Sequence, residues 1–390
     1  MDVKNIADKF VMETYSRFPV TFEYGEGVNL FDSNGKKYLD FTSGIAVNAL
    51  GYGNKKLINA ANEQMNKLFH VSNLYYTEPM AKLAQKLVEN TCFDRVFFAN
   101  SGAEANEAAL KLARKYGSLK KNGASKIISM KNSFHGRTVA TVTLTGQKKY
   151  QEGFYPLVEN IVWAEYNNID SVKELIDDDV CGIFVEPIQG EGGLLPAKQE
   201  FLEELRKICD ENKILLIFDE VQTGVGRCGK LYCYQNYGVE PDILTSAKGL
   251  GGGLPIGAMM TKENIAKCFV PGNHASTFGG NPVACAVACE ILDEITENNL
   301  LENVKNTGDY LVQKLKEIKN PHIKDVRGLG LMVGVEFDFE IKSIVSKALD
   351  KGLLLIGAGA NVIRFVPPLV ITKEDVDKCV KIFDEILSEI

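Results

Sequence analysis

The 390-residue sequence is poor in several features on which common kinds of site depend. Its four histidines, at positions 70, 135, 274 and 322, form no spacing typical of a metal site. Its nine cysteines include no C-x-x-C pair, so we expect free or structural thiols in a reducing compartment. A net charge of −7 disfavours a polyanionic partner such as nucleic acid.

Long apolar runs are also missing. None approaches the roughly 18 residues that a membrane helix needs, and the charged N-terminal segment, MDVKNIADKFVMETYSRF, lacks the apolar core of an export signal. We therefore expect a cytoplasmic protein that contacts neither nucleic acid nor membrane.

Apolar and charged residues make up 45% and 24% of the chain, as in ordinary globular proteins, and the length suggests two or three domains. Short, almost continuously apolar segments alternate with amphipathic helical stretches. We predict strands at residues 96–99, 126–129, 181–186, 214–220 and 242–247. Such strands are typical of a parallel sheet covered by helices on both faces, which predicts an open, doubly wound α/β domain. Ligands of such sheets bind at the carboxyl ends of the strands.

The two ends of the chain have a different pattern. Residues 21–41 predict a small antiparallel unit with glycine-containing turns. A long helical pattern follows Pro282, and a mixed unit of strands and a closing helix completes the chain. We therefore expect residues 1–50 and 281–390 to form one smaller α+β domain beside a large domain at residues 51–280.

Residues 214–231, ILLIFDEVQTGVGRCGKL, match more than one site pattern. The glycines fit the dinucleotide pattern G-x-G-x-x-G and also the start of a phosphate loop, G-x-x-x-x-G-K. However, DEVQT separates these glycines from the strand, and Leu231 stands where a phosphate loop needs Ser or Thr. We interpret both matches as coincidences of a glycine turn. Asp219 and Glu220, at the end of the strand, could still begin a metal site.

Two further segments follow predicted strands. In NSGAEANE, residues 100–107, Ser101 and Glu104 form an S-x-x-E capping box, which predicts a helix start. That helix start is either a plain cap or a site for an anion such as phosphate. Lys248 lies just past a strand among glycines, in SAKGLGGG. It is either a solvated surface amine or a partly desolvated amine that reacts with a carbonyl group.

Two more segments offer a ring and a carboxylate. In FHGR, Phe134 could stack on a planar ring and Arg137 could hold a carboxylate through two hydrogen bonds, although a plain loop with a buried Phe and a surface Arg is the better explanation of this motif taken alone. In VEPIQGEGG, Glu186 ends a strand and is either a ligand or a turn carboxylate. Together the segments supply an anion site, a ring-stacking side chain, an acid and an amine, which are the groups that pyridoxal 5'-phosphate requires.

The chain as a whole resembles the class III (ω-amino) pyridoxal-phosphate aminotransferases. The resemblance rests on NSGAEANEAALKLAR, FHGRT, VEPIQGEGG, IFDEVQTGVGR, SAKGLGGGLPIGA, HASTFGGNP and RFVPPL, in the order of the family. It implies the fold-type I architecture of these transferases and a homodimer whose active sites are shared between subunits. SGIAVNALG and SNLYYTEP are similar to the branch that acts on acetylornithine. The segment at Tyr52–Lys55 departs from the family, which usually has H-x-H-P there.

The resemblance also implies roles for individual residues. For the cofactor, Lys248 binds the aldehyde carbon, Asp219 pairs with the ring nitrogen, and the other cofactor-binding residues are Ser101, Gly102, Ala103, Phe134, Gln222 and, from the partner subunit, Thr277. For the substrate, Arg137 binds the distal carboxylate and Arg364 a second carboxylate, with Glu186 as the switchable partner of Arg364. Ser276 and Tyr15 complete the predicted substrate site, and no metal is expected, at Glu220 or elsewhere.

The implied reaction is transfer of the terminal amine of acetylornithine to 2-oxoglutarate. It gives N-acetylglutamate semialdehyde and glutamate, a step of arginine biosynthesis. The alternatives within the family are succinyldiaminopimelate, succinylornithine, ornithine or 4-aminobutyrate as donor. A nucleotide-dependent oxidoreductase or NTPase built on the glycine stretch is the alternative from another class.

Overall fold

A seven-stranded sheet forms the centre of the structure, a computed structural model that describes residues 3–390. Its strands, in spatial order, are β4 (Arg95–Ala99), β12 (Gly257–Thr261), β11 (Ile243–Ser246), β10 (Leu215–Asp219), β7 (Val180–Val185), β5 (Lys126–Met130) and β6 (Ile161–Ala164). All neighbours pair in parallel except β12, which is antiparallel to both β4 and β11. The predicted mostly parallel sheet is confirmed, and all five predicted strands belong to it. β6 and β12 were missed.

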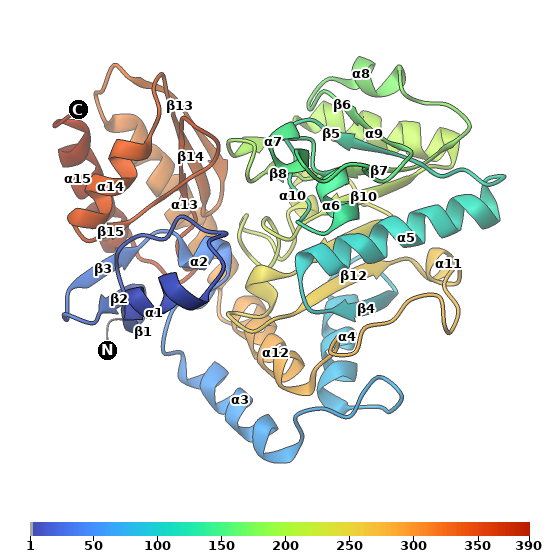
Figure 1. Ribbon diagram of the computed structural model, residues 1–390, viewed down its shortest axis with the longest axis horizontal. Coiled ribbons are helices and arrows are strands. Elements are labelled where there is room, and N and C mark those ends of the chain that lie inside the picture. The colour runs from blue at the N-terminus through green and yellow to red at the C-terminus, as the bar shows by residue number, and fades with distance from the viewer. Residues whose placement is uncertain (1–2) are drawn as a thin grey trace.

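The sheet is buried on both faces, as its apolar strands predict. In β10, Leu216 and Phe218 pack with Leu205 of helix α9 (Gln199–Asn212), whereas Leu215 and Ile217 pack on the opposite face. That opposite face is covered by α5 (Gly102–Lys120), which runs across the sheet in Figure 1. The shorter elements between these strands are α6 (Val139–Leu144), α7 (Lys148–Gln151), α8 (Ile169–Lys173), β8 (Ile188–Gln189), β9 (Leu195–Pro196), α10 (Tyr234–Tyr237) and α11 (Glu263–Ala266).

The two ends of the chain fold side by side, and both lie on the left of Figure 1. The first sheet contains β1 (Phe22–Glu26), β2 (Asn29–Asp32), β3 (Lys37–Asp40) and β15 (Leu353–Leu354), and β15 pairs with β3 although it comes over 300 residues later. The second contains β13 (Ile323–Leu329), β14 (Met332–Phe337), β17 (Val362–Phe365) and β16 (Ile356–Gly357). The predicted antiparallel unit at residues 21–41 is therefore confirmed. The proposed boundaries at residues 50 and 280 stay predictions.

The remaining helices lie at the chain ends and below the large sheet. They are α1 (Val3–Phe10), α2 (Ser43–Ala46), α3 (Lys55–Lys67), α4 (Glu78–Glu89), α12 (Pro282–Glu297), α13 (Leu300–Glu317), α14 (Lys342–Asp350) and α15 (Lys373–Leu387). The long helical pattern after Pro282 is two helices rather than one. Asn299 takes a left-handed backbone conformation (φ 54°) between α12 and α13, which ends the first helix and redirects the chain.

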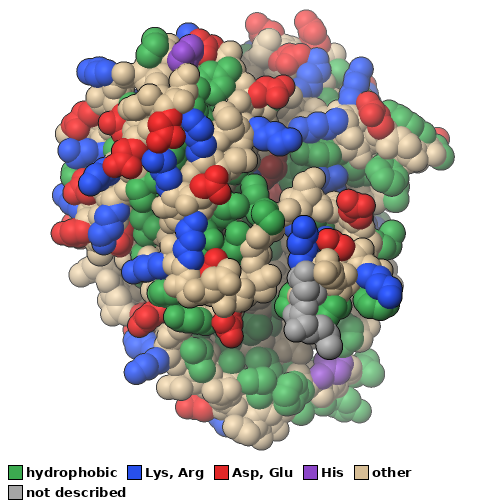
Figure 2. All heavy atoms as spheres, turned by 60° about the vertical axis from the view of Figure 1, so that its left-hand side comes forward, with side chains coloured by type: hydrophobic (Ala, Val, Ile, Leu, Met, Phe, Trp, Pro, Cys, Tyr) green, Lys and Arg blue, Asp and Glu red, His purple; other side chains and the backbone are tan. Residues whose placement is uncertain are grey.

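The surface, the cysteines and the helices add three observations. On the face seen in Figure 2, acidic and basic side chains are interspersed, and they are not separated into large patches of one sign. All nine cysteines are free thiols. Within residues 3–390, no helix has the length and apolar character needed to cross a membrane.

Candidate active site

The carboxyl ends of the strands bring most of the predicted site residues together. Strands β4, β5, β7, β10 and β11 run in the same direction, so the loops that follow them meet at one edge of the sheet. These loops and the start of α5 line a cavity of about 440 Å³. Of the predicted residues, the cavity is lined by Ser101, Gly102, Ala103, Phe134, Arg137, Glu186, Asp219, Gln222 and Lys248.

Asp219, the last residue of β10, is buried and held by three hydrogen bonds. Its Oδ1 accepts from the Val221 amide (3.0 Å), and its Oδ2 contacts Asn106 Nδ2 (2.8 Å) and His135 Nδ1 (2.7 Å). Burial alone would lower the pKa of His135, but the hydrogen bond to Asp219 raises it above its usual value. The carboxylate is therefore fixed in the cavity by hydrogen bonds to both of its oxygens.

Sequence reasoning assigned no role to Asn106 or His135. Asn106 lies on the buried face of α5, where its Oδ1 accepts a hydrogen bond from Thr245 Oγ1 (2.7 Å). A polar residue among the buried alanines of a helix was the available signal, because a buried amide needs hydrogen-bond partners. His135 was part of the FHGR motif but was passed over in favour of its neighbours.

Lys248 begins a short 3₁₀ turn two residues past the end of β11 and has a left-handed backbone conformation (φ 46°). Burial and the nearby Arg364 guanidinium lower the pKa of Lys248 to about 8. A neutral, nucleophilic amine is therefore accessible close to physiological pH, as carbonyl chemistry by a lysine requires.

The start of α5, where an anion site is predicted, lines the cavity. Ser101 Oγ accepts from the Glu104 amide (3.2 Å), which confirms the helix cap, and Glu104 Oε2 accepts from the Asn100 amide (2.6 Å). The first amides of a helix have no partner within the helix, so those of Gly102 and Ala103 remain able to bind an anion in the cavity. A side chain at Gly102 would lie 2.7 Å from Val221, so the close packing here requires glycine.

The predicted pairing of Glu186 with Arg364 is wrong for this structure. Glu186 accepts hydrogen bonds from the Phe134 amide (3.0 Å) and the Gly190 amide (3.2 Å), and burial raises its pKa to about 7. The carboxylate beside Arg364 is Glu191, whose Oε1 lies 2.5 Å from Arg364 Nη1. The chain turns at Gly190, and this turn directs Glu191, rather than Glu186, toward β17.

Arg364 does not line the cavity itself but contacts a residue that does. Its Nη1 donates to Gln222 Oε1 (3.0 Å), and its side chain is 1% exposed. Burial alone would raise the pKa of Glu191, but the Arg364 guanidinium lowers it below its usual value. Glu191 is thus a charged partner of a buried cation, and sequence reasoning missed it because VEPIQGEGG offered no way to choose between its two acids, Glu186 and Glu191.

The other substrate and cofactor residues predicted from the resemblance are dispersed. Arg137 is exposed at the cavity, and its guanidinium carbon lies 4.1 Å from the centre of the Tyr150 ring. Ser276 and Thr277 line a neighbouring cavity, separated from the first by Asn100, whose Nδ2 donates to Ser276 Oγ (3.1 Å). Tyr15 is 72% exposed and lies in a groove beside α14, so the structure does not bring it to Lys248.

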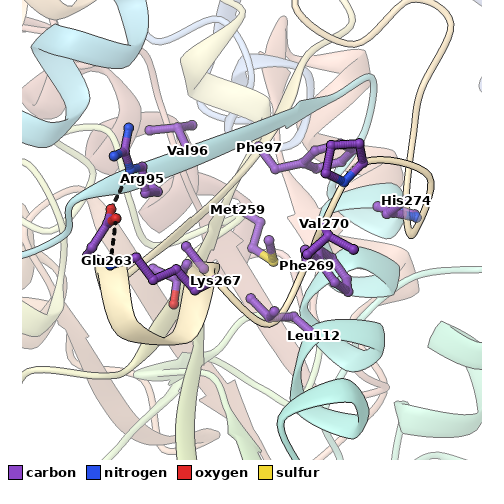
Figure 3. Close-up of a pocket in the computed structure, with 13 residues that line it drawn as sticks. Arg95, Val96, Phe97, Leu112, Met259, Glu263, Lys267, Phe269, Val270 and His274 are labelled. Atoms are coloured by element: carbon purple, nitrogen blue, oxygen red, sulfur yellow. Dashed lines mark hydrogen bonds and ion pairs between the residues drawn. The ribbon is translucent and has the colours of Figure 1, made fainter. Parts of the chain in front are cut away.

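A cavity of similar size, about 420 Å³, lies between β4, β12 and α11 (Figure 3). Its walls are mainly apolar, including Phe97, Met259 and Leu112, and the charged groups at its rim are paired with each other. Glu263 bridges Arg95 (2.5 Å) and Lys267 (3.3 Å). Because these charges are satisfied and, among its described lining residues, the cavity has no buried acid or amine, it is a weaker candidate for chemistry.

Comparison with known proteins identifies the family of the chain. The model of the family described as Aminotransferase class-III matches residues 10–387. The chain belongs to this family. It is 53% identical to the acetylornithine aminotransferase of Caldanaerobacter subterraneus subsp. tengcongensis, covering 98% of each chain, and 50% identical to the succinylornithine transaminase of Photorhabdus laumondii, covering 90% of each. The crystal structure of the ornithine aminotransferase from Toxoplasma gondii superposes with a TM-score of 0.96 at 32% identity, covering 99% of this chain and 94% of that one.

In this class-III aminotransferase, the fold-type I expectation is confirmed and the nucleotide interpretation of residues 214–231 is wrong. The glycines do not line the cavity, and Arg227 is buried, with its Nη1 donating to the carbonyls of Leu331 (3.0 Å) and Pro367 (2.5 Å). Glu220 accepts from the amides of Cys233 (2.5 Å) and Tyr234 (2.8 Å). This stretch therefore ties the large sheet to the C-terminal part of the chain.

Proposed function

We propose that this aminotransferase transfers the terminal amine of acetylornithine to 2-oxoglutarate and uses pyridoxal 5'-phosphate as its cofactor. The observation that carries the proposal is a pair of arginines in different states beside one reactive lysine. Arg137 is exposed and, among the ion pairs of residues 3–390, has no carboxylate partner, whereas Arg364 is buried and paired with Glu191. The high identity to enzymes named for acetylornithine supports the choice of donor.

The donor set of the cavity fits the cofactor. The amides of Gly102 and Ala103 would hold its phosphate, Phe134 would lie against its ring, and Asp219 would pair with its ring nitrogen. When bound, pyridoxal phosphate supplies an aldehyde that captures amines and a ring that delocalises negative charge. Gln222 lies at the same cavity, where it would reach the ring hydroxyl while also contacting Arg364.

The residues of the chain itself would carry the proton and hold the charges. The neutral Nζ of Lys248 would take the proton from the substrate carbon that bears the amine. Asp219, held by His135 and Asn106, would keep the ring nitrogen protonated, because a nearby carboxylate favours the charged form. This arrangement stabilises charge as it develops in the transition state, which is usually a large term in catalysis.

The two arginines explain how one cavity would accept two substrates. Acetylornithine has its only carboxylate far from the reacting amine, so Arg137 would bind it while Glu191 keeps Arg364 neutralised. Glutamate has a carboxylate beside the reacting amine, and this group would replace Glu191 at Arg364. Glu191 is 23% exposed in its side chain, so it can leave Arg364 at a smaller desolvation cost than a fully buried acid.

We also propose a cytoplasmic homodimer in which Thr277 of the partner subunit completes the phosphate site and Ser276 lies near the shared substrate site. Large apolar side chains are exposed in the segments close to Ser276 and Thr277, including Phe69 (61%), Tyr76 (101%) and Phe278 (60%). An exposed apolar surface of this kind is typical of a protein interface. The role of Tyr15 in substrate binding and the domain limits at residues 50 and 280 remain part of the same proposal.

Another donor of the same class is the main competing function. The identity to a succinylornithine transaminase favours succinylornithine as the second candidate. The test is a panel of single half-reactions of the cofactor-loaded protein with acetylornithine, succinylornithine, ornithine, succinyldiaminopimelate and 4-aminobutyrate, each followed by cofactor absorbance. We expect acetylornithine to react with the highest second-order rate constant. A higher rate constant for unacylated ornithine or 4-aminobutyrate would refute the proposed donor.

A further inference from the structure

Arg137 has an unusual environment for a residue that would recognise a carboxylate. It is exposed, and among the hydrogen bonds and ion pairs of residues 3–390 its guanidinium takes part in none. Its neighbours are aromatic: the guanidinium carbon lies 4.1 Å from the centre of the Tyr150 ring and 5.5 Å from that of Phe134. An arginine side chain without hydrogen-bond partners samples many rotamers. The contacts with these two rings therefore restrict the rotamers of Arg137.

Tyr150 also orients the second aromatic residue. Its ring meets the Phe134 ring edge-to-face, with centroids 5.6 Å apart and an angle of 81° between the planes. Phe134 and Arg137 line the cavity, whereas Tyr150 stands behind them on α7 and is half-buried. Among the described hydrogen bonds, none involves the Tyr150 hydroxyl. The contacts of the Tyr150 side chain with Phe134 and Arg137 are therefore made by its ring.

We propose that Tyr150 is a specificity-determining positioning residue, whose ring holds the Arg137 guanidinium toward the cavity so that it can bind the distal carboxylate of the substrate. The guanidinium keeps all its N–H donors free because a cation–π contact uses its face and leaves its edge open. Preorganisation of this kind lowers the entropy cost of binding and so favours substrates that carry the carboxylate. The inference rests on the proposed function only in taking Arg137 as the carboxylate binder.

The test uses ligands that cannot react. N-acetyl-L-norvaline has the carboxylate and acyl group of acetylornithine but no terminal amine, and N-butylacetamide lacks the carboxylate as well. Binding of each to the cofactor-loaded enzyme is measured by calorimetry for the wild type and the variants Tyr150→Leu, Tyr150→Phe and Phe154→Leu. Phe154 is a matched control, because it is an exposed aromatic residue (61%) close in sequence for which no ring contact with a cation is found among residues 3–390.

We expect Tyr150→Leu to weaken binding of N-acetyl-L-norvaline roughly five-fold, the effect of losing one exposed cation–π contact. Tyr150→Phe and Phe154→Leu should stay within two-fold of the wild type, and N-butylacetamide should bind all four proteins alike. Unchanged binding to Tyr150→Leu, an equal loss in Tyr150→Phe, or an equal loss for N-butylacetamide would each overturn the proposal, as would failure of the wild type to bind N-acetyl-L-norvaline. These outcomes are independent of turnover, so an enzyme that fails to transaminate acetylornithine would refute the proposed function separately.

Discussion

Replacing Glu191 with Gln tests the assignment of the two arginines most directly. The change removes the carboxylate 2.5 Å from Arg364 Nη1 and leaves the guanidinium, which is 1% exposed, with neutral acceptors alone: Gln222 Oε1 (3.0 Å) and the carbonyls of Gly190 (3.4 Å) and Gly357 (3.3 Å). A hydrogen bond to a charged group contributes about 1.5–3 kcal/mol, which corresponds to about a 10- to 100-fold change in an equilibrium constant.

The effect should differ between the two half-reactions. Without Glu191, the uncompensated cation would repel the ammonium end of acetylornithine, so we expect its half-reaction to slow about 10-fold or more. Glutamate would no longer have to displace a carboxylate from Arg364, so its half-reaction should keep its rate or become faster. Stopped-flow absorbance of the loaded enzyme, with one substrate at a time, measures both rate constants, and their ratio is the quantity of interest.

Glu186→Gln is the matched control, because Glu186 is also a buried acid of the cavity but hydrogen-bonds the amides of Phe134 and Gly190 instead of Arg364. It should change the two half-reactions by similar factors and leave their ratio within about three-fold. If Glu186→Gln shifted the ratio and Glu191→Gln did not, the pairing seen in the structure would not be the one used in the reaction.

Three further predictions concern the amine and the segment around β3. The pKa of Lys248 is lowered to about 8, and only the neutral amine attacks a carbonyl. Covalent binding of pyridoxal phosphate to the apoprotein should therefore accelerate as the pH rises toward 8 and level off above it. A rate that stays constant from pH 6 to 9 would contradict this. Tyr52→Phe removes the hydroxyl that donates to buried Asp40 (2.7 Å), and should lower the free energy of unfolding by about 1–2 kcal/mol in a urea titration, whereas exposed Tyr24→Phe should leave it unchanged. Ile45→Gly should raise the free energy of unfolding by about 0.5–1 kcal/mol, because Ile45 has a left-handed conformation (φ 66°) that glycine adopts without strain. A lower free energy of unfolding in this variant would refute the reasoning.

Much of the cavity could be predicted because its residues follow apolar strands. Asp219, Glu186 and Lys248 each come within two residues of a strand end, and strands that share a direction bring their ends to one edge of a sheet. The strand pattern alone therefore predicts that these three residues lie close together. Strand β12 escaped prediction because its sequence, GAMMT, is short and contains no β-branched residue until its end.

The surroundings of these residues could not be predicted in the same way. The choice between Glu186 and Glu191 depends on how the chain turns at Gly190, where a side chain would lie 2.5 Å from Gln222. Nothing in the letters VEPIQGEGG states which acid faces β17, because Arg364 belongs to a different sheet, more than 170 residues away in sequence. The contact of Tyr52 could not be predicted for the same reason. Its hydroxyl donates to Asp40 of β3, and the two residues come together only when the N-terminal sheet has formed.

Arg137 and Arg364 have different environments because they belong to different sheets. Arg137 follows β5 of the large sheet, so the site it would form for a distal carboxylate needs only the loops of that sheet and the ring of Tyr150. Arg364 lies on β17, and its partners Glu191 and Gln222 come from loops of the large sheet, so a second carboxylate would be recognised only where the two sheets meet. A change in the packing between these sheets should therefore alter the glutamate half-reaction while sparing the binding of acetylornithine by Arg137. Arg227 connects the glycine stretch to the carbonyls of Leu331 and Pro367 across the same boundary. A substitution of Arg227 is therefore the most direct way to change the packing between the two sheets.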